Sequence, residues 1–101
     1  GLCAATCGGK LYLFDPSNGS LCKQIQSANG KVLCFQELPN GLLAVGTDKG
    51  FIEIWNLETG KQVKNFQAHD SWVATLVLYF DTQNKGILIS GDRNGVIKVW
   101  Q

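Results

Sequence analysis

Short runs of alternating apolar and polar residues recur along the chain, separated by turns rich in Gly, Asn and Asp. The run FIEIW at 51–55 alternates with a period of two, as a β-strand with one buried face does. KVLCFQEL before it ends in a Pro-Asn-Gly turn, and LLAVG ends in the turn TDKG. KQVKNFQ at 61–67 is more polar, which is typical of an edge strand facing water. The pattern predicts four antiparallel strands between residues 27 and 66, and it predicts no helix anywhere in the chain.

A similar pattern occurs three times. Phe14, Trp55 and Trp100 end equivalent runs and are spaced by 41 and 45 residues. A glycine stands five residues before each of these aromatic residues, namely Gly9, Gly50 and Gly95. Self-similarity at a period of about 40 to 45 residues indicates a repeat architecture. We therefore expect Phe14, Trp55 and Trp100 to be the anchors of three successive units.

Composition and charge exclude several classes of function. The chain has 101 residues and a formal net charge of +1, and its nine Lys and Arg residues are scattered, so no basic stripe predicts nucleic acid as a direct partner. No uncharged run is long enough to cross a bilayer, and the uncharged start of the chain, residues 1–9, does not resemble a signal peptide. Because the chain starts at Gly1 and contains no Met, we interpret it as a segment of a longer protein.

The four cysteines, at positions 3, 7, 22 and 34, contain no Cys-x-x-Cys pair, and the one histidine, His69, is far from them. We expect these cysteines to be reduced, buried and to pack as small hydrophobic side chains. Free thiols favour a reducing, intracellular compartment, either cytoplasm or nucleus. The sequence predicts neither a metal nor another cofactor.

Three stretches resemble the strand-turn-strand signature of the WD-repeat β-propellers: LPNGLLAVGTDKGFIEIWN, AHDSWVATLVLYF and ILISGDRNGVIKVWQ. His69 matches the histidine of the Gly-His dipeptide in that family, with Ala68 in place of Gly, and Trp100 follows 31 residues later. The resemblance implies an all-β fold of four-stranded antiparallel blades. It divides the chain into a partial blade at 1–26 (strands b, c and d), a complete blade at 27–66 and a partial blade at 67–101 (strands a, b and c).

Such propellers close with about 4 to 8 blades. The resemblance therefore implies that the remaining blades of the same propeller, or further copies of the chain, complete the ring.

In that family a His, a Ser or Thr, an Asp and the Trp form a hydrogen-bonded tetrad within a blade. Carried over by position, the tetrad is His69, Ser90, Asn94 and Trp100, where Asn94 holds the usual Asp position and Asp92 is a possible substitute. In the second unit the His, Ser and Asp positions hold Ala28, Val45 and Lys49. We therefore expect the unit of Trp55 to be stabilised by packing alone.

The motifs do not favour catalysis. His69 is followed by Asp70 and Ser71, but no nucleophile elbow surrounds them. GTDKG and GDRNG are glycine-rich, but no helix is predicted after them to bind phosphate, so we interpret them as turns. We therefore do not expect the chain to be an enzyme.

The resemblance implies a non-enzymatic scaffold that presents loops to protein or peptide partners, with no membrane contact. Trp72, before a predicted innermost strand, is either an aromatic anchor for a partner or a residue packed on the neighbouring unit. The candidate partner-binding residues are Asp48, Lys49, Asp70, Ser71, Trp72, Arg93 and Asn94. The alternatives are self-assembly of several copies into a ring, or a segment of an enzyme or RNA-associated complex whose functional residues lie elsewhere.

Overall fold

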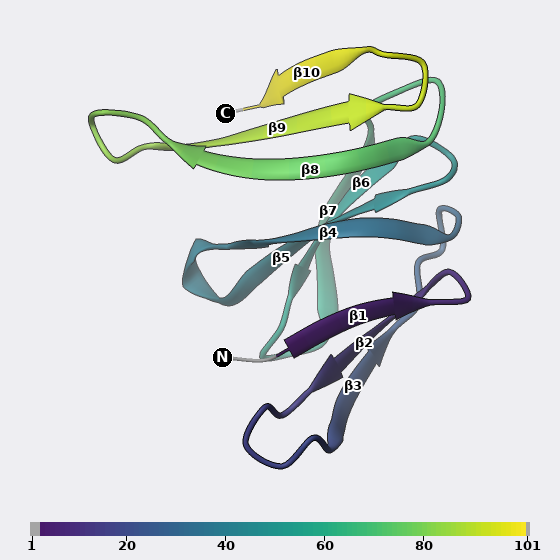
Figure 1. Ribbon diagram of the computed structural model, residues 1–101, viewed down its shortest axis with the longest axis vertical. Coiled ribbons are helices and arrows are strands. Elements are labelled where there is room, and N and C mark those ends of the chain that lie inside the picture. The colour runs from purple at the N-terminus through teal and green to yellow at the C-terminus, as the bar shows by residue number, and fades with distance from the viewer. Residues whose placement is uncertain (1–2, 101) are drawn as a thin grey trace.

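In the described part of the chain, ten strands form three antiparallel sheets, which are stacked face to face (Figure 1). The computed structural model describes residues 3–100. The first sheet contains β1 (Cys3–Cys7), β2 (Lys10–Phe14) and β3 (Leu21–Ile25). The second contains β4 (Val32–Leu38), β5 (Leu42–Thr47), β6 (Phe51–Asn56) and β7 (Lys61–Gln67). The third contains β8 (Val73–Phe80), β9 (Gly86–Asp92) and β10 (Ile97–Trp100).

The predicted all-β fold is confirmed. Within residues 3–100 the only helical segment is the short 3-10 turn η1 (Pro39–Gly41) between β4 and β5. The strands follow one another in space in their sequence order, so each sheet is a simple meander. Among the described residues, the four-stranded sheet is flanked on each side by a three-stranded one. No helix among the described residues is long and apolar enough to cross a membrane.

The hydrophobic core lies in two layers, one on each side of the second sheet. Leu43 and Val45 of β5 belong to the layer shared with the first sheet. Ala44, between them, belongs to the layer shared with the third sheet. Successive side chains of a strand point to opposite faces, so a central strand that is covered on both faces is apolar at every position. This double burial explains the continuous apolar run LLAV in β5.

The second and third sheets approach closely where β8 packs against β4 and β5. At Gly46 an added Cβ would lie 2.5 Å from Cγ1 of Val73 and 2.7 Å from Sγ of Cys34. Glycine at this position therefore lets β8 pack closely against β4 and β5.

The expectation that all four cysteines are buried is wrong for three of them. All four are free, but Cys3, Cys7 and Cys22 are exposed and only Cys34 is partly buried. In the register of β1, β2 and β3, the exposed thiols lie on the face opposite to Leu11 and Leu13. That face packs against no other sheet within the described residues.

Candidate functional site

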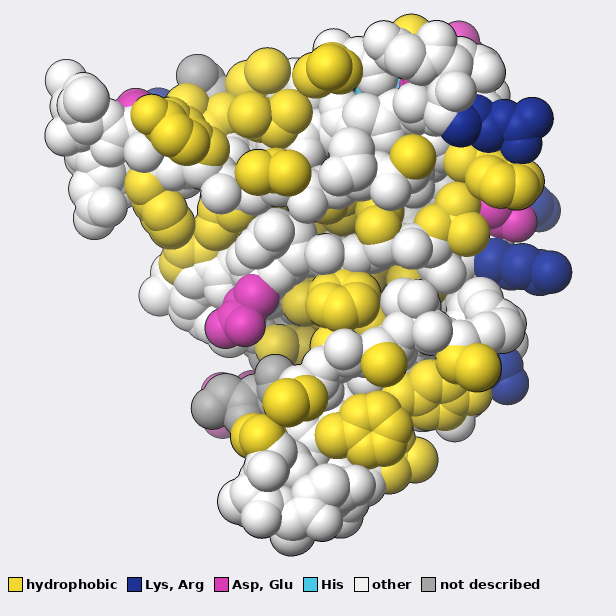
Figure 2. Space-filling model, in the orientation of Figure 1, with side chains coloured by type: hydrophobic (Ala, Val, Ile, Leu, Met, Phe, Trp, Pro, Cys, Tyr) yellow, Lys and Arg dark blue, Asp and Glu magenta, His cyan; other side chains and the backbone are white. Residues whose placement is uncertain are grey.

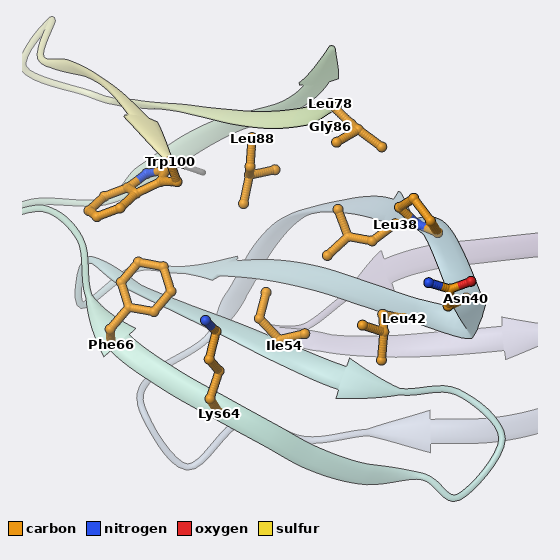
Figure 3. Close-up of a pocket in the computed structure, with 11 residues that line it drawn as sticks. Leu38, Asn40, Leu42, Ile54, Lys64, Phe66, Leu78, Gly86, Leu88 and Trp100 are labelled. Atoms are coloured by element: carbon orange, nitrogen blue, oxygen red, sulfur yellow. The ribbon is translucent and has the colours of Figure 1, made fainter. Parts of the chain in front are cut away.

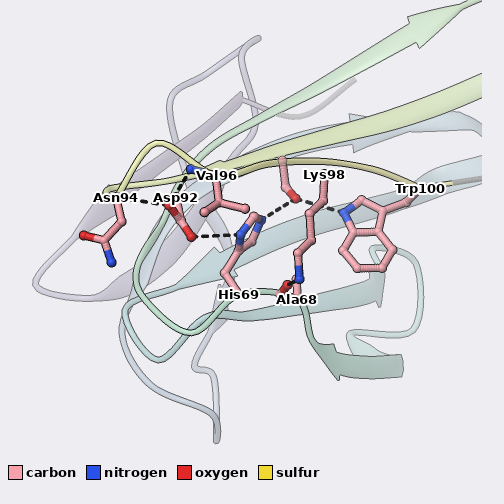
Figure 4. Close-up of polar contacts among 8 residues, drawn as sticks. Ala68, His69, Asp92, Asn94, Val96, Lys98 and Trp100 are labelled. Carbon is pink, nitrogen blue, oxygen red and sulfur yellow. Dashed lines mark hydrogen bonds and ion pairs between the residues drawn. The ribbon is translucent and has the colours of Figure 1, made fainter.

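A buried hydrogen-bond network joins β9, β10 and the connection 68–72 that precedes the third sheet (Figure 4). The indole N–H of Trp100 donates to Oγ of Ser90 at 2.9 Å, and that oxygen lies 2.7 Å from Nε2 of His69. Nδ1 of His69 lies 3.1 Å from Oδ2 of Asp92. Because Trp can only donate, the Ser90 hydroxyl hydrogen is free to donate to Nε2. A neutral His69 then carries its hydrogen on Nδ1 and donates it to Asp92.

The carboxylate in this network is that of Asp92, and not the side chain of Asn94. Asp92 and Ser90 are two residues apart in β9, so their side chains lie on the same face of the strand. Asn94 lies in the following turn, where Figure 4 shows its side chain pointing away from His69. Asn94 contributes its backbone N–H, which donates to Oδ1 of Asp92 at 2.9 Å.

The backbone N–H of Val96 also donates to Oδ1 of Asp92, at 3.0 Å. This bond is the main cause that holds the pKa of Asp92 below its ordinary value, and the bonds from Asn94 and the nearby His69 act in the same direction. The side chain of Asp92 is only 4% exposed. The carboxylate is therefore kept ionised beside His69.

The second sheet has a different buried network, centred on Glu53, which is 0% exposed. Oε1 of Glu53 accepts the indole N–H of Trp55 at 3.1 Å. Oε2 accepts Oγ–H of Ser27 at 2.8 Å and Nδ2–H of Asn29 at 2.7 Å. The expectation that the unit of Trp55 depends on packing alone is therefore wrong. Glu53 thus links β6 to the connection 26–31 by hydrogen bonds. In the next unit, His69 links β9 to the connection 68–72 in a similar way.

A signal for this network is present in the sequence. Glu53 stands two residues before Trp55 in β6, so both side chains lie on the same strand face. The equivalent residue two before Trp100 is Lys98, whose ammonium donates to the backbone oxygen of Ala68 at 2.6 Å. In both units, the charged residue two before the Trp hydrogen-bonds to the connection that precedes the sheet. The residue is an anion in the second unit and a cation in the third. Reasoning from the positions of the tetrad alone does not find it.

The geometry of His69 indicates a structural role, in which the ring links parts of the third unit by hydrogen bonds. Both ring nitrogens of His69 are engaged, and the residue is 2% exposed, so a substrate has no access to it. Asp70 and Ser71 make no side-chain hydrogen bond to His69 within residues 3–100. In the described part of the chain, no three His, Cys, Asp or Glu residues are grouped as metal ligands would be.

Several turns and connections lie at one edge of the stack, which is the right-hand edge in Figure 1. We call this edge the turn face, and it comprises residues 8–10, 26–31, 48–50, 68–72 and 92–95. The backbone N–H of Lys31 donates to Oδ1 of Asp48 at 2.9 Å, and that of Val32 donates to Gly9 O at 2.8 Å. Gly50 O accepts the backbone N–H groups of residues 68 and 69, at 2.9 and 3.0 Å. Backbone hydrogen bonds thus link each unit to the next along this face.

Gly50 shows how tightly the turn face is packed. Its φ of +83° is in the left-handed region that favours glycine, and an added Cβ would collide with the backbone oxygen of His69. The turn 48–50 is therefore held against the connection 68–72.

Trp72 and Arg93 form a stacked pair on the turn face. The guanidinium carbon of Arg93 lies 4.4 Å from the centroid of the Trp72 ring, and the backbone N–H of Arg93 donates to Trp72 O at 3.2 Å. The Trp72 side chain remains 45% exposed. All seven candidate partner-binding residues lie on this face: Lys49, Asp70, Trp72, Arg93 and Asn94 are exposed, and Asp48 and Ser71 are half-buried.

The three aromatic anchor positions lie at or near the ends of β2, β6 and β10. Phe14, Trp55 and Trp100 are each half-buried. Trp100 packs on Phe66 of β7, with ring centroids 4.8 Å apart and an interplanar angle of 57°. This contact joins the second and third sheets at their outer strands.

Comparison with known proteins agrees with this architecture. Residues 60–101 match the family model "WD domain, G-beta repeat". The chain is 29% identical over 91 residues to the angio-associated migratory cell protein of Homo sapiens. This match covers 89% of this chain and 21% of that protein. It is 42% identical over 55 residues to meiotic fizzy-related protein 1 of Schizosaccharomyces pombe, covering 54% of this chain and 12% of that protein.

Among solved structures, a chain in the crystal structure of the mitotic checkpoint complex superimposes with a TM-score of 0.83 at 20% identity. The match covers 99% of this chain and 30% of that chain. This likeness shows the fold. The chain spans about a fifth of the length of the first curated relatives that it matches.

Proposed function

We propose, because the chain belongs to the WD-repeat β-propeller family, that it is part of a non-enzymatic protein-interaction scaffold whose turn face contacts a protein partner. WD-repeat proteins generally act as protein-interaction scaffolds. We propose that the partner is a protein or peptide, that it contacts the turn face, and that the chain acts inside the cell. The fold alone does not assign function, whereas the residues of the turn face have properties typical of an interaction surface.

The exposed Trp72 carries the proposal. A tryptophan that remains 45% exposed adds little to the core, yet Arg93 and the backbone hold it in one place. Trp and Arg are enriched among residues that dominate binding energy at protein interfaces. A rigid aromatic side chain also loses little conformational freedom on binding. The pair therefore supports an anchor at the centre of an interface.

The charges around this pair favour an acidic partner surface. Figure 2 shows Lys and Arg side chains gathered along the right-hand edge, which is the turn face. Asp48 and Asp92 also lie there, but each has an oxygen committed to backbone hydrogen bonds within the chain, which leaves Asp70 as the exposed carboxylate. The basic residues of the turn face are Lys10, Lys31, Lys49 and Arg93.

Site-specific photocrosslinking tests the proposal. A photoreactive amino acid at position 72 is expected to capture a protein partner in cells, and the same amino acid at position 63 of β7 is the control. Val63 is 56% exposed and lies away from the turn face. Crosslinks from position 63 and none from position 72 would contradict the proposal. Crosslinks to nucleic acid would favour the RNA-associated alternative.

A second observation favours assembly with further blades. Val77, Tyr79, Ile97 and Val99 are 48 to 72% exposed, and in the register of β8, β9 and β10 they lie on the face turned away from the second sheet. An apolar sheet face of this kind is normally covered in a repeat protein. We propose that further blades of the same propeller, or another copy of the chain, cover it. Sedimentation of the 101-residue chain should show self-association, and a stable monomer would contradict this proposal.

A further inference from the structure

A cavity of about 380 Å³ lies between the second and third sheets (Figure 3). It is bordered by the turn η1 and by Gly86 at the start of β9, so it lies toward the ends of the sheets opposite to the turn face. Cavities of roughly 300 to 1,000 Å³ are typical of ligand sites. The size of this cavity suits one or two large side chains of a bound peptide.

Most of the cavity wall is apolar. Ile54 of β6 and Leu88 of β9 face each other across it, and Leu42 lies near the turn η1. The rings of Phe66 and Trp100, which contact each other at a tilt, close the opposite end. Such a wall favours an aliphatic or aromatic group, because its burial removes apolar surface from water.

Two polar groups border this apolar wall. Figure 3 shows the ammonium group of Lys64 pointing between the two sheets, and it lies 5.9 Å from the ring centroid of Phe66. Within residues 3–100, no carboxylate lies within ion-pair distance of the Lys64 ammonium. The side-chain amide of Asn40 lies at the rim and also makes no hydrogen bond in that part of the chain. An unpaired cation beside an apolar cavity is complementary to a carboxylate next to an apolar group.

We propose that this cavity binds a short linear peptide of a protein partner in which a large aliphatic or aromatic residue stands next to an acidic residue. The apolar side chain enters between Ile54 and Leu88, and the carboxylate accepts a hydrogen bond from the Lys64 ammonium. Asn40 is placed to bond the peptide backbone, since a carboxamide both donates and accepts. None of the residues that line this cavity belongs to the turn face. Peptide binding in the cavity can therefore be tested independently of partner binding at Trp72.

Selection from a phage-displayed library of random heptapeptides tests this inference with the 101-residue chain. The enriched peptides are expected to share a large apolar residue adjacent to Asp or Glu. A synthetic fluorescent copy of one of them should bind Lys64→Gln roughly tenfold or more weakly, measured by anisotropy. Lys61→Gln is the matched control, because it removes the same charge from an exposed residue of β7 that does not line the cavity.

A second variant tests the cavity itself. At Gly86 an added Cβ would meet Phe80 and Leu78 at the ordinary contact distances of 3.4 and 3.5 Å, so Gly86→Val should fold and narrow the cavity. It is expected to weaken peptide binding, with folding checked by circular dichroism. The proposal is overturned if the selected peptides lack the acidic and apolar pair, or if Lys64→Gln binds as tightly as Lys61→Gln. Loss of binding in Trp72→Ala alone would assign the peptide to the turn face and also overturn it.

Discussion

Trp55 donates its indole N–H to Oε1 of Glu53, two residues earlier in the same strand, at 3.1 Å. Trp100 makes its corresponding bond to Ser90 on the neighbouring strand. Two successive units thus satisfy the same buried donor in different ways. Since a buried indole N–H without an acceptor is costly, the second unit keeps a polar network even though it lacks the histidine.

We expect Glu53→Ala to lower the free energy of unfolding by about 3 kcal/mol or more, because it removes the acceptor of three hydrogen bonds and leaves buried donors unpaired. Urea denaturation measures the loss. Glu58→Ala is the control, since Glu58 is exposed in the turn after β6 and its change should stay within about 0.5 kcal/mol. Equal losses in the two variants would mean that Glu53 does not hold the second unit together.

The carboxylate of Asp92 should make stability depend on acid pH. Its pKa is lowered in the folded state from an ordinary 3.8, so it stabilises the fold above that pH, and the contribution is lost as pH falls through the lower folded pKa. Asp92→Asn should therefore lose less stability than the wild type does between about pH 6 and about pH 2.5. Thermal unfolding across this range measures the difference.

Asn94→Ala is the control for that experiment. The Asn94 side chain is exposed, and only its backbone N–H contacts Asp92, so its acid profile should match that of the wild type. If the acid profile followed Asn94 and not Asp92, the assignment of the network carboxylate would be incorrect.

The two tryptophans of the third unit should differ in their contribution to stability. We expect Trp100→Ala to cost about 3 to 5 kcal/mol and Trp72→Ala about 1 kcal/mol. Trp100 packs on Phe66 and bonds Ser90, whereas Trp72 is nearly half exposed. Chemical denaturation of both variants measures the difference, and equal losses would show that Trp72 is a core residue.

The four thiols should react at very different rates. Burial raises the pKa of Cys34 to about 11, and its Sγ–H donates to the backbone oxygen of Val73 at 3.4 Å, so little reactive thiolate forms near pH 8. Cys3, Cys7 and Cys22 are exposed and should be alkylated first. Mass spectrometry during iodoacetamide treatment checks the order, and rapid labelling of Cys34 would contradict the burial.

The strands could be predicted from the sequence because their signals are local. The alternation in FIEIW and the turn residues after LLAVG determine where β6 and β5 begin and end. The location of the exposed cysteines could not be predicted in this way. An apolar strand face looks the same in sequence whether or not another sheet covers it, and the face that holds Cys3 and Cys7 has no cover among the described residues.

The candidate site could be predicted only in part. The resemblance points to His69, Ser90 and Trp100 because those residue types stand at the family spacing. Choosing between Asp92 and Asn94 needs the face of β9 on which each side chain lies. The sequence does not single out Glu53, because a carboxylate in a strand usually faces solvent, and only the folded chain brings Ser27 and Asn29 to it.

The most direct test of the proposed function is the dissociation constant of the partner captured at position 72, measured for the wild type and for Trp72→Ala by calorimetry. A hot-spot tryptophan should weaken binding roughly 30-fold or more, with the free energy of unfolding lowered only by about 1 kcal/mol. A Trp72→Ala variant that binds this partner as tightly as the wild type would contradict the claim that the turn face is its interaction surface.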